Sequence, residues 1–214
     1  MKSKTILFQG DSITDGNRWR NDDMNLGHSY AAMIAGQLGK ELAASRPRFL
    51  NRGISGDRVS DLYARWNEDF CSLKPDVLSI LIGVNDAWRT VDGLASGVTD
   101  RFERAYRYLL EETREVMPDT GIIICEPFVL NTGARTAEWD KWQKLIPAYQ
   151  EAARRLAEKS EAVFVPLQSA FDRALSEADA SYWLYDGVHP TTAGHQLIAE
   201  AWLAVVQSSK LAVR

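Results

Sequence analysis

Short apolar runs alternate along this chain with longer stretches in which apolar residues recur every three or four positions. Each short run is continuously apolar, as expected of a strand that is covered on both faces of a parallel sheet. The runs are Thr5–Phe8, Phe49–Leu50 with its neighbours, Val77–Ile82, Gly121–Cys125 and Ala162–Val165. We therefore predict a parallel sheet built from these five segments.

Helical spacing of apolar residues fills segments between and after the predicted strands. Asp57 and Thr192 are placed to cap helix starts, and Pro118 ends the long central helix. The residues at helical spacing are Val59, Leu62, Trp66 and Phe70; Phe102, Tyr106, Leu109, Thr113 and Val116; Trp142, Leu145, Ile146, Tyr149, Ala153 and Leu156; and Leu197, Ile198, Ala201 and Val205. This alternation predicts an α/β fold with right-handed crossovers and helices on both faces of the sheet.

Length and composition fit a single domain over residues 1–214. Hydrophobic residues make up 45% of the chain, enough for a sizeable core without disulfides or metals. No repeat, low-complexity tract or linker interrupts the pattern. Two long polar connections, 17–29 and 131–138, are of the kind that can wall a pocket.

Charge and cysteine content narrow the partners and the compartment. The net charge of −4 and the dispersed basic residues give no stripe for nucleic acid. No segment approaches the ~18 apolar residues of a membrane span, and the first predicted strand is too short for a signal-peptide core. We therefore expect a cytoplasmic protein. Cys71 and Cys125 are expected to be free thiols, although a disulfide between them stays open.

Candidate chemistry follows the predicted strands. Ser12 comes shortly after the first strand, Gly56 after the second and Asn85 after the third, while Asp186 and His189 precede the last helix. The carboxyl ends of parallel strands share one edge of the sheet, where ligands bind. These residue types therefore converge on one place.

The converging residues match the parts of a serine nucleophile system. Ser12 needs a base, His189, which in turn needs a carboxylate, Asp186, to orient it. The amide N–H groups of Ser12 and Gly56 and the side chain of Asn85 are candidate donors to an oxyanion. Each residue also has a structural explanation alone: a helix cap for Ser12, turn geometry for Gly56, a loop bond for Asn85. Their joint occurrence at one edge favours the functional interpretation.

The order of these parts resembles the GDSL, or SGNH, hydrolase family. The blocks are Gly10-Asp11-Ser12-Ile13, Gly53-Ile54-Ser55-Gly56-Asp57, Gly83-Val84-Asn85-Asp86 and Asp186-Gly187-Val188-His189-Pro190. The resemblance covers the whole chain. It implies a flavodoxin-like three-layer α/β/α sandwich and ester hydrolysis through an acyl-serine, without metal or cofactor. It also implies the roles given above for Ser12, Gly56, Asn85, Asp186 and His189.

Within that family the chain is most similar to the carbohydrate acetylesterases, the acetylxylan esterases in particular. The segments that carry this likeness are Gly10–Asp15, Asn51–Gly56, Ala64-Arg65-Trp66, Val84–Arg89, Pro127-Phe128, and His189-Pro190 followed by Ala193-Gly194-His195. The likeness implies removal of acetyl groups from xylo-oligosaccharides. It therefore implies a small acetylated sugar as substrate, and a homo-oligomer.

Substrate contacts are expected from Asp11, Trp88 and Arg58, which adjoin the catalytic blocks. A tryptophan face could carry a sugar ring, with packing in the core as the alternative. Arg58 could bind hydroxyls, with a salt bridge to Asp57 or Asp86 as the alternative.

Other functions fit the sequence less well. A lysophospholipase, thioesterase or arylesterase would use the same machinery, but the polar 17–29 connection lacks the apolar patch typical of lipid handling. A nucleotide-binding module would need a phosphate loop, where this chain has Asp11 and Asp15. Asp22, Asp23 and His28 fit no standard metal spacing, so no metal is expected.

Overall fold

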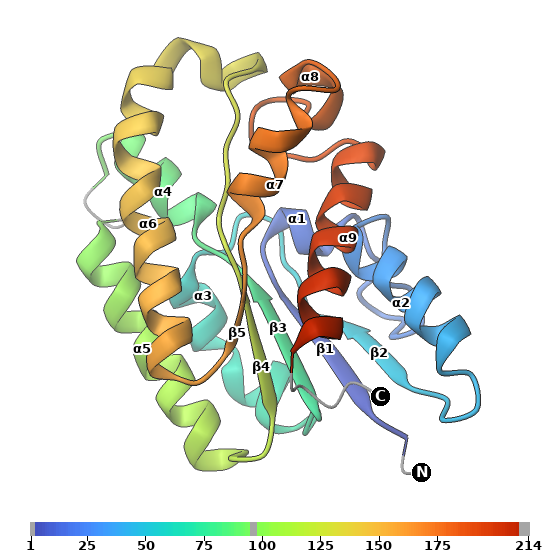
Figure 1. The fold of residues 1–214 in the computed structure, drawn as a ribbon. Coiled ribbons are helices and arrows are strands. Elements are labelled where there is room, and N and C mark those ends of the chain that lie inside the picture. The colour runs from blue at the N-terminus through green and yellow to red at the C-terminus, as the bar shows by residue number, and fades with distance from the viewer. Residues whose placement is uncertain (1–2, 95–97, 210–214) are drawn as a thin grey trace.

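Five parallel strands form one sheet in the computed structural model, which describes residues 3–94 and 98–209. The strands lie in the order β2-β1-β3-β4-β5 (Figure 1). Their bounds are β1 Thr5–Gly10, β2 Arg48–Asn51, β3 Val77–Leu81, β4 Gly121–Cys125 and β5 Val163–Val165. All five predicted strands are confirmed, with ends that shift by one or two residues.

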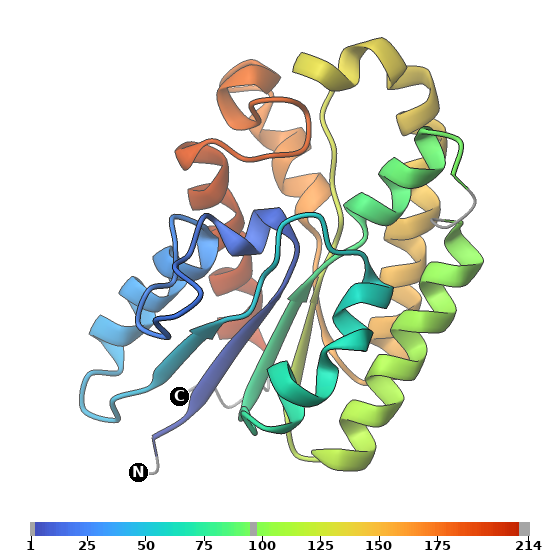
Figure 2. The same ribbon diagram turned by 180° about the vertical axis from the view of Figure 1, so that it is seen from behind.

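Helices cover both faces of the sheet, as predicted. The longer ones are α2 Tyr30–Glu41, α5 Thr99–Val116, α6 Trp139–Lys159 and α9 Thr192–Ser208, and the shorter ones are α1 Ser12–Asp15, α3 Val59–Ala64, α4 Val84–Val91, α7 Leu167–Ala174 and α8 Ala180–Trp183. Helices α2 and α9 pack together on one face, while α3, α5 and α6 pack on the other (Figure 2). The molecule is therefore the three-layer α/β/α sandwich that the sequence predicts.

Two predicted helix caps are wrong. The residue before α3 is Arg58, not Asp57, and its amide N–H donates to the Asp61 carboxylate at 2.9 Å. The Asp57 carboxylate instead pairs with Arg65 at 2.9 Å, so it is not available to cap the helix. At α9 the cap is Thr191, whose hydroxyl accepts the Gly194 N–H at 3.2 Å, one residue before the predicted Thr192.

The helical pattern over residues 59–70 is also broken in the structure. Helix α3 ends at Ala64, and a π-helical turn, Asn67–Cys71, follows. The apolar spacing still buries Trp66 against Phe70, whose rings stack with centroids 4.8 Å apart. The spacing therefore predicted burial correctly but not the helix type.

The core lies between the sheet and the helices on each face. Trp66, Trp142 and Trp202 are fully buried in it, and for Trp66 and Trp142 this agrees with their helical spacing. The Trp202 indole N–H donates to the Ser79 hydroxyl at 3.0 Å, so α9 is bonded to the middle of β3. Among the described residues no helix is long and apolar enough to cross a membrane.

The strand order places a crevice beside β1. The chain leaves β1 for β2 on one side and continues through β3 on the other, so connections diverge between β1 and β3. Open parallel sheets bind ligands at such a divergence, beyond the carboxyl ends of the strands. Ser12 follows β1 and Asn85 follows β3, so both predicted site residues lie at this edge.

Candidate active site

Ser12 is the first residue of the short helix α1, which begins directly after β1. The Asp11 carboxylate caps this helix by accepting the Ile13 N–H at 3.0 Å. The first N–H groups of a helix have no intrahelical acceptor. The Ser12 N–H is thus left available next to its own hydroxyl.

The hydroxyl of Ser12 begins a hydrogen-bonded chain of three side chains. Its Oγ lies 2.9 Å from Nε2 of His189, and Nδ1 of His189 lies 2.8 Å from Oδ2 of Asp186. These distances are within the range of good hydrogen bonds. The structure therefore brings together the three residues that the sequence predicted as nucleophile, base and orienting carboxylate.

A tight loop holds Asp186 and His189 in place. An isolated bridge between Leu184 and Pro190 closes the loop, and the Leu130 N–H donates to the Gly187 carbonyl at 3.0 Å. Gly187 has φ +92°, and a Cβ there would lie 2.5 Å from Cγ of Arg135. Only glycine fits this position, because both its backbone conformation and its contact with Arg135 exclude a side chain.

The pKa shifts of Asp186 and His189 agree with His189 acting as the base. Burial opposes ionisation of Asp186, but hydrogen bonds from the His189 ring and from the His189 and Val188 amides outweigh it and lower the Asp186 pKa. The hydrogen bond to Asp186 raises the pKa of His189 above its usual 6.5. Asp186 is thus ionised in the working range, and it stabilises a proton on His189.

The two other predicted oxyanion donors lie on neighbouring loops. Gly56 occupies the third position of a turn closed by the Asp57 N–H and the Ile54 carbonyl at 3.2 Å, and its φ of +88° favours glycine. A Cβ on Gly56 would meet no atom within 4 Å, so the space above this backbone is open. The Asn85 side-chain amide donates to the Asp57 carbonyl at 3.0 Å. This bond joins the Asn85 side chain to the Gly56 turn and leaves its second N–H for a ligand.

The prediction that Asp11 contacts substrate is wrong. Its side chain is completely buried, because it turns inward to cap α1. Burial raises its pKa to about 7. Asp86 shares this environment: it is buried, accepts the Val59 N–H at 3.2 Å, and burial raises its pKa to about 7. Both acids hold helix starts and do not face a ligand.

Arg58 is bound within its own helix start. Its guanidinium makes two hydrogen bonds to Asp61, at 2.9 and 3.0 Å, and not to the predicted partners Asp57 and Asp86. A paired, half-buried guanidinium has limited freedom to meet a substrate. The substrate contact expected of Arg58 stays a prediction.

One face of Trp88 is covered. The Arg135 guanidinium lies 4.0 Å above the centre of the Trp88 ring, and the Trp142 ring packs on Trp88 at a centroid distance of 6.2 Å. Arg135, from the 3₁₀ helix Gly133–Glu138, is itself buried. The face under Arg135 cannot carry a sugar ring, so any sugar contact of Trp88 must use its remaining exposed surface.

A pocket of about 320 Å³ opens beside Ser12 and His189. Its polar lining includes Asn17, Ser55, Tyr185 and His195. The sequence predicted a wall from the 17–29 connection, which Asn17 provides. It did not single out Tyr185 or His195 as site residues, although His195 lies in a segment that carries the family resemblance. Their approach to Ser12 depends on tertiary packing.

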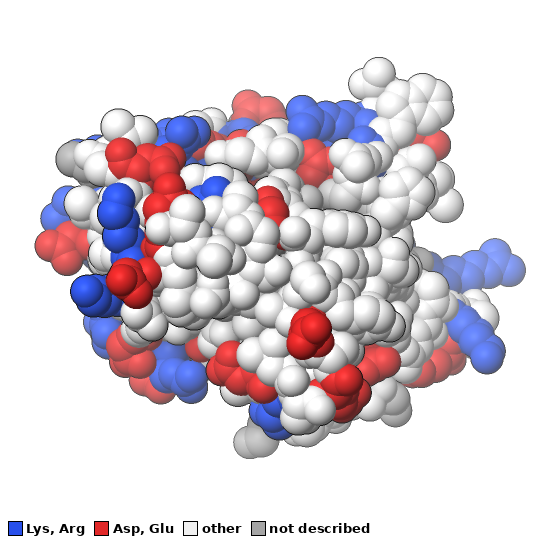
Figure 3. All heavy atoms as spheres, turned by 90° about the horizontal axis from the view of Figure 1, so that it is seen from above, with Lys and Arg blue, Asp and Glu red and all other residues white. Residues whose placement is uncertain are grey.

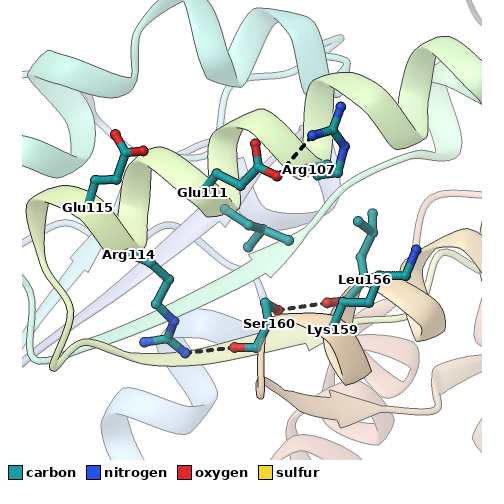
Figure 4. Close-up of a pocket in the computed structure, with 8 residues that line it drawn as sticks. Arg107, Glu111, Arg114, Glu115, Leu156, Lys159 and Ser160 are labelled. Atoms are coloured by element: carbon teal, nitrogen blue, oxygen red, sulfur yellow. Dashed lines mark hydrogen bonds and ion pairs between the residues drawn. The ribbon is translucent and has the colours of Figure 1, made fainter.

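A second hollow lies between the C-terminal halves of α5 and α6, at the other edge of the sheet (Figure 4). Three of its charged side chains are already bonded: Arg107 to Glu111 at 2.9 Å, and Arg114 to the carbonyls of Thr120 and Ser160 at 2.7 and 3.0 Å. No nucleophile–base pair lines it. In the part of the chain that the structure describes, no group of three or more His, Cys, Asp or Glu could hold a metal ion.

The fold and the site together define an ester hydrolase of the α/β class. The chain belongs to the GDSL-like lipase/acylhydrolase family, whose model matches residues 8–197. It is 36% identical over 206 residues to an acetylxylan esterase of Geobacillus stearothermophilus, which covers 92% of this chain and 91% of that protein.

Solved structures of similar sequence support the same family assignment. A protein of Parabacteroides merdae described as a GDSL-like lipase superposes with a TM-score of 0.92 and 44% identity, over 96% of each chain. Axe2, an acetylxylan esterase of G. stearothermophilus, superposes with a TM-score of 0.86 and 34% identity, over 100% of this chain and 98% of that one. Structures described as catalytic mutants of Axe2 replace a serine, a histidine and an aspartate.

Proposed function

We propose that this protein is a serine esterase that removes O-acetyl groups from carbohydrates, such as acetylated xylo-oligosaccharides, through an acyl-serine. The observation that carries the proposal is the bonded chain Ser12–His189–Asp186, with contacts of 2.9 and 2.8 Å, at the ligand-binding edge of the sheet. A serine hydroxyl becomes an effective nucleophile only when such a base accepts its proton.

The first half of the reaction forms the acyl-serine. Ser12 Oγ attacks the ester carbonyl while His189 Nε2 takes the hydroxyl proton, and Asp186 stabilises the imidazolium that results. The carbonyl oxygen gains negative charge and accepts hydrogen bonds from the Ser12 and Gly56 amides and the Asn85 side chain. His189 then donates its proton to the leaving sugar oxygen, and the carbon–oxygen bond breaks.

The second half releases the acid. Water enters the place that the sugar has left, and His189 takes one of its protons as the oxygen attacks the acetyl-serine carbonyl. The same donors stabilise the second oxyanion. Collapse of this intermediate returns the proton from His189 to Ser12 Oγ and releases acetic acid, which ionises to acetate in solution, and the free enzyme is restored.

Two observations support an acetylated carbohydrate as the substrate. The first is the likeness to the acetylxylan esterase over most of both chains. The second is the surface over the site: uncharged side chains dominate the middle of the face seen from above (Figure 3). The polar lining of the pocket consists of amide, hydroxyl and imidazole groups and one carboxylate, Asp15, which is paired with Arg20 at 2.9 Å. Such groups match the hydroxyls of a neutral sugar.

We also propose that the protein works in the cytoplasm as a homo-oligomer. Cys71 and Cys125 are both free thiols, as a reducing compartment would keep them. Large apolar side chains are exposed on the described surface, Trp19 at 62% and Tyr185 at 68%, and such residues are frequent in interfaces. Light scattering during size-exclusion chromatography measures the molar mass of the protein in solution. The mass of a monomer would refute the proposed homo-oligomer.

A chain-length series tests the proposed substrate. Acetate release from acetylated xylo-oligosaccharides is measured beside hydrolysis of p-nitrophenyl acetate and p-nitrophenyl octanoate, with Ser12→Ala as the control. We expect rapid acetate release, rapid cleavage of the acetate ester and negligible cleavage of the octanoate. Preference for the octanoate, with the sugars untouched, would leave the site intact but assign it to lipid or thioester chemistry.

A further inference from the structure

His195 is one of three titratable residues, with Asp15 and Tyr185, that line the Ser12 pocket and that the mechanism above does not use. It lies in the first turns of α9, and its Nδ1 accepts the backbone N–H of Tyr30, the first residue of α2, at 3.2 Å. An imidazole nitrogen that accepts a hydrogen bond carries no proton, so the proton of the neutral ring is on Nε2. Burial, with the nearby charge of His189 second, lowers the His195 pKa to about 4. The ring is therefore neutral in the working range.

The Nε2–H of His195 has no protein acceptor among the described residues. No bond from this atom is formed, and the atom is not among the buried polar atoms of the described chain that lack a partner. It therefore reaches open space, and the open space that His195 lines is the pocket beside Ser12. A fixed, uncharged donor faces the place where a substrate would lie.

The chemistry of the reaction says which part of the substrate this pocket takes. His189 must give its proton to the leaving oxygen, so the leaving alcohol must lie on the His189 side of Ser12. The pocket wall contains His189, Pro190 and His195, as well as Ser55, which precedes Gly56 in the chain, and it contains no residue of the Asn85 helix. The pocket is therefore the compartment of the alcohol, and the acetyl group lies toward the oxyanion donors.

We propose that His195 is a specificity-determining residue of this alcohol compartment, where its Nε2–H donates to a hydroxyl or ring oxygen of the departing sugar. This inference rests on the proposed carbohydrate deacetylation and names the group that recognises the sugar. An aryl leaving group such as p-nitrophenol has no hydroxyl or ring oxygen beside its ester oxygen. The bond to His195 therefore favours sugar esters over aryl esters that share the same acetyl group.

Two substitutions separate this role from the structural role of the ring. In His195→Asn the side-chain oxygen can take the position of Nδ1 and accept the Tyr30 N–H, but no donor reaches the position of Nε2. In His195→Gln the amide N–H can take the position of Nε2, while the bond to Tyr30 is lost. Gln196→Ala, at the exposed next residue of α9, is the matched control.

The readout is kcat/KM for acetylated xylo-oligosaccharides and for p-nitrophenyl acetate, with the melting temperature of each variant. Both esters form the same acetyl-serine, so a difference between them reports only the leaving group. We expect His195→Asn to lower kcat/KM about tenfold for the sugar ester, the effect of one lost hydrogen bond, and less than about threefold for the aryl ester. His195→Gln should retain sugar-ester selectivity but melt at a lower temperature.

Each other outcome overturns a defined part of the account. Equal loss on both esters in His195→Asn would mean that His195 acts through His189, and no loss on either would remove its role altogether. Wild-type protein that cleaves the aryl ester but no sugar ester would refute the proposed function and, with it, the role of His195. Selectivity unchanged in His195→Asn, with sugar esters cleaved well by the wild type, would refute the His195 inference alone.

Discussion

Ser12 is positioned by its neighbours on both sides. Asp11 caps the four-residue helix that begins at Ser12. His189, which lies on a separate loop, accepts the hydrogen bond of the Ser12 hydroxyl. The nucleophile therefore depends on a backbone turn that its own hydroxyl does not build. This separation lets the hydroxyl be removed with little effect on the fold.

Ser12→Ala should lower kcat by at least about 10³-fold, because among the described residues no other hydroxyl or thiol is bonded to His189. The free energy of unfolding should change by less than about 0.5 kcal/mol, since the half-exposed Ser12 side chain caps no helix. Ester hydrolysis and thermal denaturation of the same preparation measure both. Substantial remaining turnover would show that Ser12 is not the nucleophile.

The His189–Asp186 bond predicts the pH dependence. His189 must be neutral to accept the Ser12 proton, and its pKa is raised above 6.5 by Asp186. The acid limb of kcat/KM should therefore have its midpoint above 6.5, with activity rising as the pH passes through it. In Asp186→Asn the His189 pKa should fall, as an NMR titration of the ring would detect. A His189 titration that does not move would contradict the assigned partner.

Asn85→Ala should lower kcat by about 10²–10³-fold, with a smaller change in KM, because a donor to an oxyanion acts mainly in the transition state. The bond from Asn85 to the Asp57 carbonyl is lost as well, so thermal denaturation is followed in parallel. A change confined to KM would instead make Asn85 a group that positions the ground-state ester.

At the scale of elements, buried acids connect the loops that carry the site. Asp86, in the first turn of α4, accepts the Val59 N–H at the start of α3, just after the Gly56 turn. The helix that carries Asn85 is thereby tied to the loop that carries Gly56. The bond from the Asp86 carboxyl to Val59 therefore helps to hold Asn85 at a constant distance from the Gly56 amide.

Asp86 also makes stability depend on pH. Burial raises its folded pKa to about 7, from 3.8 in a free chain. Below pH 4 the carboxyl is protonated in both states, but as the pH rises toward 7 only the unfolded chain ionises freely, which favours unfolding. Asp86→Asn should keep the bond to Val59, and its melting temperature relative to wild type should increase from pH 4 to pH 7. A difference that is flat with pH would refute the buried titration.

The elements also show where sequence patterns reach their limit. Apolar runs predicted every strand, because a strand covered on both faces must be apolar wherever it lies. Residue preference placed the α3 cap at Asp57, yet that carboxylate is bound by Arg65, which directly follows the last residue of α3. The apolar residues named at helical spacing include none from α2, α4, α7 or α8. In α2 the spacing is present, since Tyr30, Ile34 and Leu38 recur every four residues and are buried.

The catalytic residues of the site could be predicted from the sequence, but the direction of two neighbouring side chains could not. Ser12, Asp186 and His189 could be predicted because the chemistry demands those residue types and the strand order brings them to one edge. Asp11 was misassigned because nearness to Ser12 in sequence does not tell whether a side chain turns inward. His195 was not assigned a role, since the direction of its ring depends on the packing of α9 against α2.

On the scale of the whole molecule, Trp202 connects helix α9 to the sheet. It is fully buried on α9, packs on Phe8 of β1 and donates to the Ser79 hydroxyl of β3. Helix α9 also carries His195 and follows the Asp186–His189 loop. Trp202 therefore helps to position α9 against the middle of the sheet.

Trp202→Phe should destabilise the fold by about 1–3 kcal/mol, because it leaves a small void and removes the indole donor of the buried Ser79 hydroxyl, which then keeps only its contact with Cys125 Sγ at 3.8 Å. The melting temperature should fall by about 2–4 °C for each kcal/mol. Ser79→Ala should lessen the effect of Trp202→Phe, since the hydroxyl that loses its indole donor is then absent. Strictly additive losses would contradict the bond between α9 and β3.

The most direct test of the account is to identify the atom that becomes acetylated during turnover. The protein is mixed with acetylated xylo-oligosaccharide, quenched in acid within the first turnover, digested and analysed by mass spectrometry. We predict an acetyl group on the peptide that contains Ser12, and none in Ser12→Ala. Release of acetate by the wild type with no acetyl at Ser12, or with acetyl at another residue, would contradict the proposed acyl-serine.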